Sequence, residues 1–166
     1  GIGSTFHFSL RLQTDERASP QPLKHVDLRG KRILLVDDNA TNRRVLSGML
    51  AAWDIIPNAV DSAAAALARM HTDGPHFDCI ILDAHMPEMD GYELARQLRC
   101  QFDHLPPMLM LSSGAMRGDG RRCQELGISG FFSKPISTED LLAALCRVFE
   151  QTSGKLPAPP NQLVTR

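Results

Sequence analysis

The chain has 166 residues and a formal net charge of −1 at pH 7, with 43% hydrophobic and 22% charged residues. This length accommodates one domain with tails, or at most two very small domains, and the composition is that of an ordinary soluble globular protein. The near-neutral charge argues against a general nucleic-acid binder, which would carry a basic excess, and no apolar stretch is long enough to cross a bilayer.

Between two polar, proline-containing stretches, the chain alternates short apolar runs with segments of helical character. The apolar runs predict buried strands, and the segments between them predict helices. In chain order we expect strand 32–36, helix 41–52, strand 55–60, helix 63–71, strand 78–82, helix 92–101, strand 108–111, helix 117–126, strand 130–132 and helix 139–149.

Capping residues mark several of the predicted helix ends. Asn39 or Thr41 can cap the first helix, Ser62 the second, and Thr138 the last. Gly127 follows the fourth helix at the position where a left-handed residue usually ends a helix.

Five strand–helix pairs with continuously apolar strands predict a parallel sheet that is covered on both faces. Right-handed crossovers then give an α/β doubly wound (βα)5 sandwich. The flavodoxin-like strand order 2-1-3-4-5 is the natural candidate. Pro57 lies in the second predicted strand, and proline suits the edge position that this order gives to that strand.

Charged residues follow three of the predicted strands. Asp37 and Asp38 follow the first strand, Asp83 the third, and Lys134 the fifth. Because the carboxyl ends of parallel strands share one edge of the sheet, all four side chains can reach one pocket. Three crowded carboxylates repel one another unless a cation lies among them, and hard oxygen ligands suit Mg²⁺. A carboxylate beside Mg²⁺ and a lysine can receive a phosphoryl group.

Simpler interpretations exist for each of these residues taken alone. Asp37 and Asp38 could be an acidic pair at a helix N-terminus, and Lys134 could be a solvated loop charge. A phosphohydrolase of the haloacid type would need a catalytic Asp two residues after the nucleophile, and position 85 is His. The four residues in order and at the right strand ends favour the phosphoryl acceptor.

Residues 31–150 resemble a two-component receiver domain. The resemblance rests on the acidic pair after the first strand, the acceptor Asp after the third strand, the loop that follows it, the hydroxyl residue that ends the fourth strand, and the Lys-Pro pair after the fifth. In this chain these are Asp37 and Asp38, Asp83, residues 86–91 (Met-Pro-Glu-Met-Asp-Gly), Ser112, and Lys134 with Pro135.

The resemblance implies a role for each site residue. Asp38 and Asp83 would bind Mg²⁺ directly, Asp37 would bind it through water, and His85 would offer its backbone carbonyl. Asp83 would take the phosphoryl group from a phosphohistidine, and water would later remove it, so the isolated domain would be a phosphoacceptor with self-dephosphorylation. Lys134 would neutralise charge in the transition state.

Two further residues form the expected switch. The Ser112 hydroxyl would hydrogen-bond to the phosphoryl group and move toward it, and Phe131 would turn inward into the vacated space. Ser113 is an alternative to Ser112, and Phe131 could instead be an ordinary core residue.

The tails resemble parts of a larger protein. Residues 1–12 resemble the last glycine motif and strand of the ATP-binding domain of histidine kinases, residues 13–30 read as a linker, and residues 151–166 read as a proline-rich linker to a following domain. The resemblance implies a parent that is a hybrid sensor histidine kinase, anchored in a membrane or not, with this part in the cytoplasm. The widely spaced cysteines, none of them in a Cys-x-x-Cys pair, fit reduced thiols in that compartment and argue against a zinc site.

The resemblance also implies partners. The first helix would dock on the dimerisation and phosphotransfer helices of a histidine kinase or on a histidine phosphotransfer domain, and we expect the domain itself to be a monomer. The expected contact residues are Arg43, Arg44, Leu46, Ser47 and Gly48. An alternative function is control of the kinase core by an anionic ligand or nucleotide bound at the basic fourth helix, through Arg117, Arg121 and Arg122.

Overall fold

The computed structural model describes residues 26–114 and 119–153. In chain order the elements are β1 (Arg32–Val36), α1 (Ala40–Ala51), β2 (Ile56–Val60), α2 (Ala63–Asp73), the 3₁₀ helix η1 (Gly74–His76), β3 (Cys79–Asp83), α3 (Gly91–Gln101), β4 (Met108–Ser112), α4 (Asp119–Glu125), β5 (Gly130–Ser133) and α5 (Thr138–Ser153).

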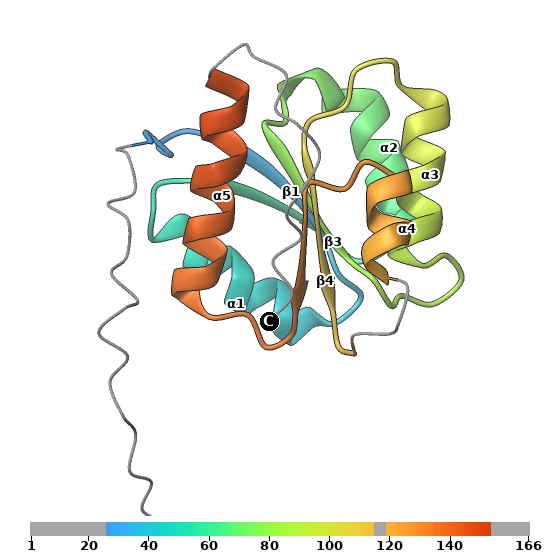
Figure 1. The fold of residues 1–166 in the computed structure, drawn as a ribbon, viewed down its shortest axis with the longest axis horizontal. Helices are drawn as coiled ribbons and strands as arrows, with labels where there is room; N and C mark the ends of the chain where they lie inside the picture. The colour runs from blue at the N-terminus through green and yellow to red at the C-terminus, as the bar shows by residue number, and fades with distance from the viewer. Residues whose placement is uncertain (1–25, 115–118, 154–166) are drawn as a thin grey trace, which may run out of the picture.

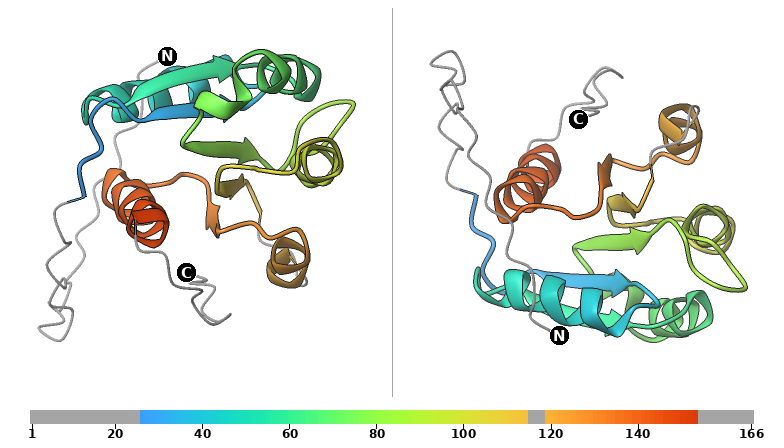
Figure 2. Two further views of the ribbon diagram at one scale, coloured as in Figure 1. Left: turned by 90° about the horizontal axis from the view of Figure 1, so that it is seen from above. Right: turned by 90° about the horizontal axis from the view of Figure 1, so that it is seen from below.

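The five strands form one parallel sheet in the order β2-β1-β3-β4-β5 (Figure 1). Helices cover both faces, with α1 and α5 on one side and α2, α3 and α4 on the other (Figures 1 and 2). The predicted doubly wound fold and its strand order are therefore confirmed. Pro57 lies in β2, an edge strand as predicted, where a missing backbone N–H is tolerated.

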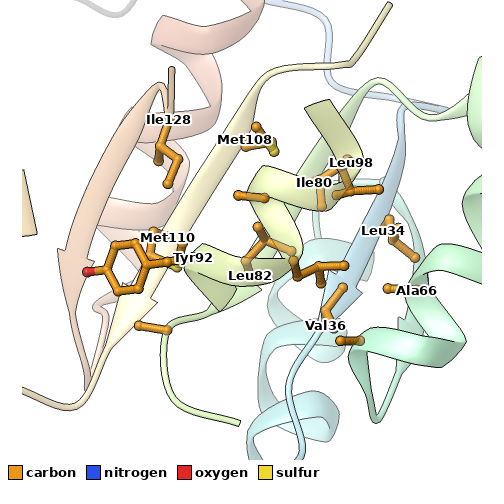
Figure 3. Close-up of a cluster of buried hydrophobic side chains, with 14 of the residues drawn as sticks. Leu34, Val36, Ala66, Ile80, Leu82, Tyr92, Leu98, Met108, Met110 and Ile128 are labelled. Atoms are coloured by element: carbon orange, nitrogen blue, oxygen red, sulfur yellow. The ribbon is translucent and has the colours of Figure 1, made fainter. Parts of the chain in front are cut away.

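Alternating side chains of each central strand supply two separate cores. Leu34 and Val36 of β1 point toward α2 and α3, into the cluster drawn in Figure 3. Ile33 and Leu35, between them in the sequence, join the core beneath α1 and α5. Because both faces of the strands are buried, the strands read as continuous apolar runs, which is why the sequence revealed them.

The helix caps agree with the sequence at three places and differ at one. Asn39 caps α1, since its side chain accepts hydrogen bonds from the N–H groups of the first turn, and Ser62 caps α2. Gly127 follows α4 with φ +59°, as a C-terminal glycine should. The prediction of Thr138 as the cap of α5 is wrong, because the Ser137 hydroxyl accepts the N–H of Asp140 at 3.0 Å.

Among the described residues, no helix has the length and hydropathy needed to cross a membrane. Cys79, Cys100 and Cys146 are free thiols. Burial raises the pKa of the Cys79 thiol to about 12, so this side chain stays protonated and unreactive at neutral pH.

Two glycines offer a paired test of this packing. A Cβ at Gly91 would lie 2.1 Å from the backbone oxygen of Asp83, whereas a Cβ on the exposed face of α1 at Gly48 would meet nothing within 4 Å. Gly91→Ala should lower the free energy of unfolding by about 2 kcal/mol through overpacking. Gly48→Ala should raise it by roughly 0.5–1 kcal/mol, because alanine favours a helix. Urea unfolding measures both, and changes of the same sign would contradict the described packing.

Candidate functional site

The candidate site lies where the parallel strands end. Asp37 and Asp38 directly follow β1, and Asp83 is the last residue of β3. Ser112 is the last residue of β4, and Lys134 directly follows β5. Since all the strands run the same way, these residues share one edge of the sheet.

Lys134 joins two of the carboxylates. Its Nζ lies 2.7 Å from Oδ2 of Asp37 and 2.8 Å from Oδ2 of Asp83. The two carboxylate side chains are only 1% and 5% exposed, and the lysine side chain is 13% exposed. Desolvation offsets much of the attraction in an ion pair this far from water, but removing Lys134 would leave two buried carboxylates without their ammonium.

Asp38 adds a third carboxylate, which is exposed to solvent. One oxygen from each of Asp37, Asp38 and Asp83 lies within 4.8 Å of the others. Three carboxylates face the Lys134 ammonium, and the Arg43 guanidinium lies on the neighbouring carbonyls, so the cluster keeps an excess of negative charge. The hard oxygen donors, the remaining charge and the open side at Asp38 fit a divalent cation.

The first turn of α1 holds Asp37 and Asp38, here called the acidic loop, in place. The Asp37 carboxylate accepts the backbone N–H of Asn39 at 2.9 Å and the side-chain amide of Asn42 at 3.2 and 3.3 Å. Arg43 donates through Nη1 to the backbone oxygens of Asp37 and Asp38, at 2.7 and 2.9 Å. Sequence reasoning missed the roles of Asn42 and Arg43. Their spacing of three and four residues from the cap Asn39 was the available signal.

The loop after β3 surrounds the other side of Asp83. The backbone N–H of His85 donates to Asp83 Oδ1 at 3.2 Å, while the His85 side chain is exposed. Gly91 closes the loop by donating its N–H to the Ala84 carbonyl at 3.2 Å. The metal role of the His85 carbonyl stays a prediction.

Ser112 is fully buried, and its hydroxyl bonds to the backbone of Gly114. Its Oγ donates to the Gly114 carbonyl at 2.8 Å and accepts the Gly114 N–H at 3.3 Å. The Ser112 backbone oxygen accepts the N–H of Lys134 at 2.7 Å, which ties the end of β4 to the lysine. Ser113 is exposed. The catalytic and switching roles of Ser112 stay predictions.

Phe131 is 9% exposed and belongs to the core cluster on the α2–α3–α4 side of the sheet. It already occupies the inward position that we expected only after phosphoryl transfer. Its role as a switch stays a prediction, and its packing fits the alternative of an ordinary core residue.

A cavity of about 350 Å³, here called the α1 groove, opens beside Lys134. Val45 lies on its rim and is 50% exposed, whereas Leu46 is 4% exposed and belongs to the core. Val45 therefore offers a partner on α1 more exposed apolar surface than Leu46 does, and the contact role of Leu46 stays a prediction. The lining residues are Asn42, Val45, Leu46, Met49, Leu111, Ser113, Lys134, Pro135 and Ile136.

The other expected contact residues of α1 differ in their surroundings. Arg44 and Gly48 are exposed, and Ser47 is half-buried, so these three stay available to a partner. Arg43 is half-buried and engaged with the acidic loop.

The arginines of α4 that the structure describes already have acidic partners. Arg121 pairs with Glu125 at 3.0 Å. Arg122 lies 3.7 Å from the Asp90 carboxylate, and its guanidinium carbon is 4.1 Å from the centre of the Tyr92 ring. Arg117 lies outside the described residues. The basic helix therefore gives little support to an anion site.

Comparison with known proteins agrees with this geometry. The family model described as the response regulator receiver domain matches residues 33–146. Histidine kinase 2 of Arabidopsis thaliana is 36% identical over 146 residues, covering 74% of this chain and 12% of that protein. Sensor histidine kinase GacS of Pseudomonas protegens is 33% identical over 134 residues, covering 78% of this chain and 14% of that protein. The chain thus spans a small part of these kinases.

A solved structure shows the same fold. Chemotaxis protein CheY4 of Vibrio cholerae is 30% identical and superposes with a TM-score of 0.66, covering 72% of this chain and 98% of that one.

The ion pairs of Lys134 predict a large effect on stability. Lys134→Ala leaves Asp37 and Asp83 buried without their ammonium, so the free energy of unfolding should fall by about 3 kcal/mol. Adding Mg²⁺ should restore part of that loss, because a cation replaces the missing charge. Urea unfolding with and without Mg²⁺ measures both effects.

Lys31→Ala is the matched control, since Lys31 pairs with Asp78 at 2.9 Å but is 36% exposed. That change should lower stability by less than about 1 kcal/mol. Equal losses for the two lysine variants would contradict the distinction between the buried and the exposed pair.

Proposed function

We propose a function that starts from the family: the chain belongs to the response regulator receiver domain family. In this proposal, Asp83 accepts a phosphoryl group from a phosphohistidine in a two-component phosphorelay. The observation that supports this most directly is the ion pair of Lys134 with both Asp37 and Asp83, beside the third carboxylate of Asp38. This arrangement combines an acceptor, a fixed ammonium and a cation site in one pocket.

We propose Mg²⁺ as the cation. Asp38 and Asp83 would hold it directly, Asp37 through water, and His85 through its backbone carbonyl. When bound, Mg²⁺ supplies positive charge that neutralises the phosphoryl oxygens. The exposed Asp38 leaves room for the waters that this ion retains.

In the proposed reaction, a carboxylate oxygen of Asp83 forms a bond to phosphorus while the bond between phosphorus and the donor histidine nitrogen breaks. The transition state of such a transfer is loose, so the protein assists mainly by position and charge. Lys134 is fixed beside the acceptor oxygen and can pair with a phosphoryl oxygen as that charge arrives. Attack by water on the acyl phosphate later returns Asp83 to its carboxylate.

The phosphoryl group adds negative charge and acceptor oxygens next to β4 and the loop after β3. We propose that the Ser112 hydroxyl then leaves Gly114 for the phosphoryl group. Ser113 and Gly114 would move with it, which changes the surface beside β5. Phe131 would respond by repacking within its core position.

We propose that the parent protein is a hybrid histidine kinase working in the cytoplasm, with the chain as its receiver. The support is the similarity to receiver segments of histidine kinase 2 and GacS. The α1 groove is the proposed docking site for the helix that carries the phosphohistidine, in a kinase or in a histidine phosphotransfer domain. It lies beside Lys134, and its rim presents the exposed apolar side chain of Val45.

The first test is phosphate incorporation from a phosphorylated histidine kinase core. The intact chain should be labelled only when Mg²⁺ is present, and Asp83→Asn should take up no label, because the acceptor carboxylate is gone. Labelling of Asp83→Asn equal to that of the unchanged chain would contradict the proposal.

If the donor protein docks at the α1 groove, a change in the groove should slow transfer from a protein donor but not from a small-molecule donor. Val45→Asp places a charge on the groove rim, so the second-order rate of transfer from a phosphohistidine protein should fall roughly 10-fold, equal to about 1.4 kcal/mol. Transfer from acetyl phosphate should stay unchanged, because this small donor needs no docking surface.

Ile56→Asp serves as the control, because Ile56 on β2 is 49% exposed and does not line the groove. It should alter neither rate. A Val45→Asp protein that accepts phosphate from the protein donor at the normal rate would refute docking at the α1 groove.

A further inference from the structure

Asp37 is the most deeply buried carboxylate of the site, at 1% exposure. A buried carboxylate needs partners for its oxygens. Among the described residues, its donors are the Lys134 ammonium, the Asn39 backbone N–H and the side-chain amide of Asn42. Asn42 differs from the other two because its Nδ2 lies within 3.3 Å of both carboxylate oxygens.

Lys134 has to serve more than one partner. It contacts Asp37 and Asp83 together, at 2.7 and 2.8 Å. In the proposed function it turns toward an incoming phosphoryl oxygen, and its hold on Asp37 then weakens. A neutral donor that stays in place can keep the Asp37 carboxylate oriented during that exchange.

The placement of Asn42 suits such a donor. Its backbone N–H and that of Thr41 donate to the Asn39 side chain, at 3.3 and 2.9 Å, which fixes the first turn of α1. Arg43, the next residue, grips the carbonyls of the acidic loop from the same turn. Asn42 also lines the α1 groove, so it connects the docking surface to the acidic cluster.

We infer that Asn42 is a positioning residue, whose amide orients the Asp37 carboxylate for the cation and for Lys134. This inference rests on the proposed function as far as the cation is concerned. The contact between Asn42 and Asp37 does not depend on the proposed function. Groups that orient the ligands of a metal commonly change metal affinity 10–100-fold when they are removed.

The first measurement is the affinity for Mg²⁺, determined from the changes in amide chemical shifts when Mg²⁺ is added to the 166-residue chain. Asn42→Ala removes the donor, and Asn42→Leu removes it while keeping a side chain of similar size. Both should weaken Mg²⁺ binding roughly 10-fold. Asn58→Ala is the matched control, because Asn58 is a half-buried asparagine of β2 whose amide donates to the Ile56 carbonyl. It should leave the affinity unchanged.

The second measurement is a double-mutant cycle on the free energy of unfolding, without metal, that combines Asn42→Ala with Asp37→Ala. If Asn42 acts through Asp37, the effect of Asn42→Ala should vanish once Asp37 is absent. Unfolding of each Asn42 variant also shows whether it is folded, so a purely structural loss is separated from a change in affinity of the folded protein.

Unchanged Mg²⁺ affinity in both Asn42 variants would overturn the inference. An equally large effect of Asn42→Ala with and without Asp37 would overturn it too. Failure of the unchanged chain to bind Mg²⁺ would instead remove the proposed function. The double-mutant cycle needs no metal, so it would still decide whether Asn42 acts through Asp37.

Discussion

One interaction organises the candidate site, the bridge from the Lys134 ammonium to the buried carboxylates of Asp37 and Asp83. It joins the ends of β1, β3 and β5, and the lysine lies 97 residues from Asp37 in the sequence. The parallel sheet brings these groups together, and loss of Lys134 would leave two buried carboxylates without their ammonium. Because three carboxylates share this ammonium, the site keeps an excess of negative charge that a cation can neutralise.

Helix α1 connects this bridge to the surface. Its cap and first turn supply Asn39, Asn42 and Arg43, which hold the side chain of Asp37 and the backbone of the acidic loop. Its next turn supplies Val45 to the rim of the α1 groove. A partner seated on α1 would therefore touch the element that orients the acidic cluster, which provides a direct physical route from docking to chemistry.

The strands, their order and the acidic cluster could be predicted because each rests on a strong pattern: continuous apolar runs, a proline at an edge, and charges at strand ends. The misses arose where neighbouring residues offer the same chemistry. Ser137 and Thr138 both carry a hydroxyl, and only the backbone path selects the cap. Val45 and Leu46 are both apolar, and only the fold shows that Leu46 is buried while Val45 is half exposed; the contact role of Leu46 stays a prediction. Asn42 resembles a solvated helix residue until the fold places Asp37 beside it.

The most direct measurement of the central claim is the chemical identity of residue 83 after phosphoryl transfer. Borohydride reduces an acyl phosphate to the alcohol, so a phosphorylated aspartate becomes homoserine and can be located by peptide mass spectrometry. We expect homoserine at position 83, formed only when Mg²⁺ and a phosphodonor were both present. Homoserine at another aspartate, or stable phosphate on a residue outside the acidic cluster, would contradict it.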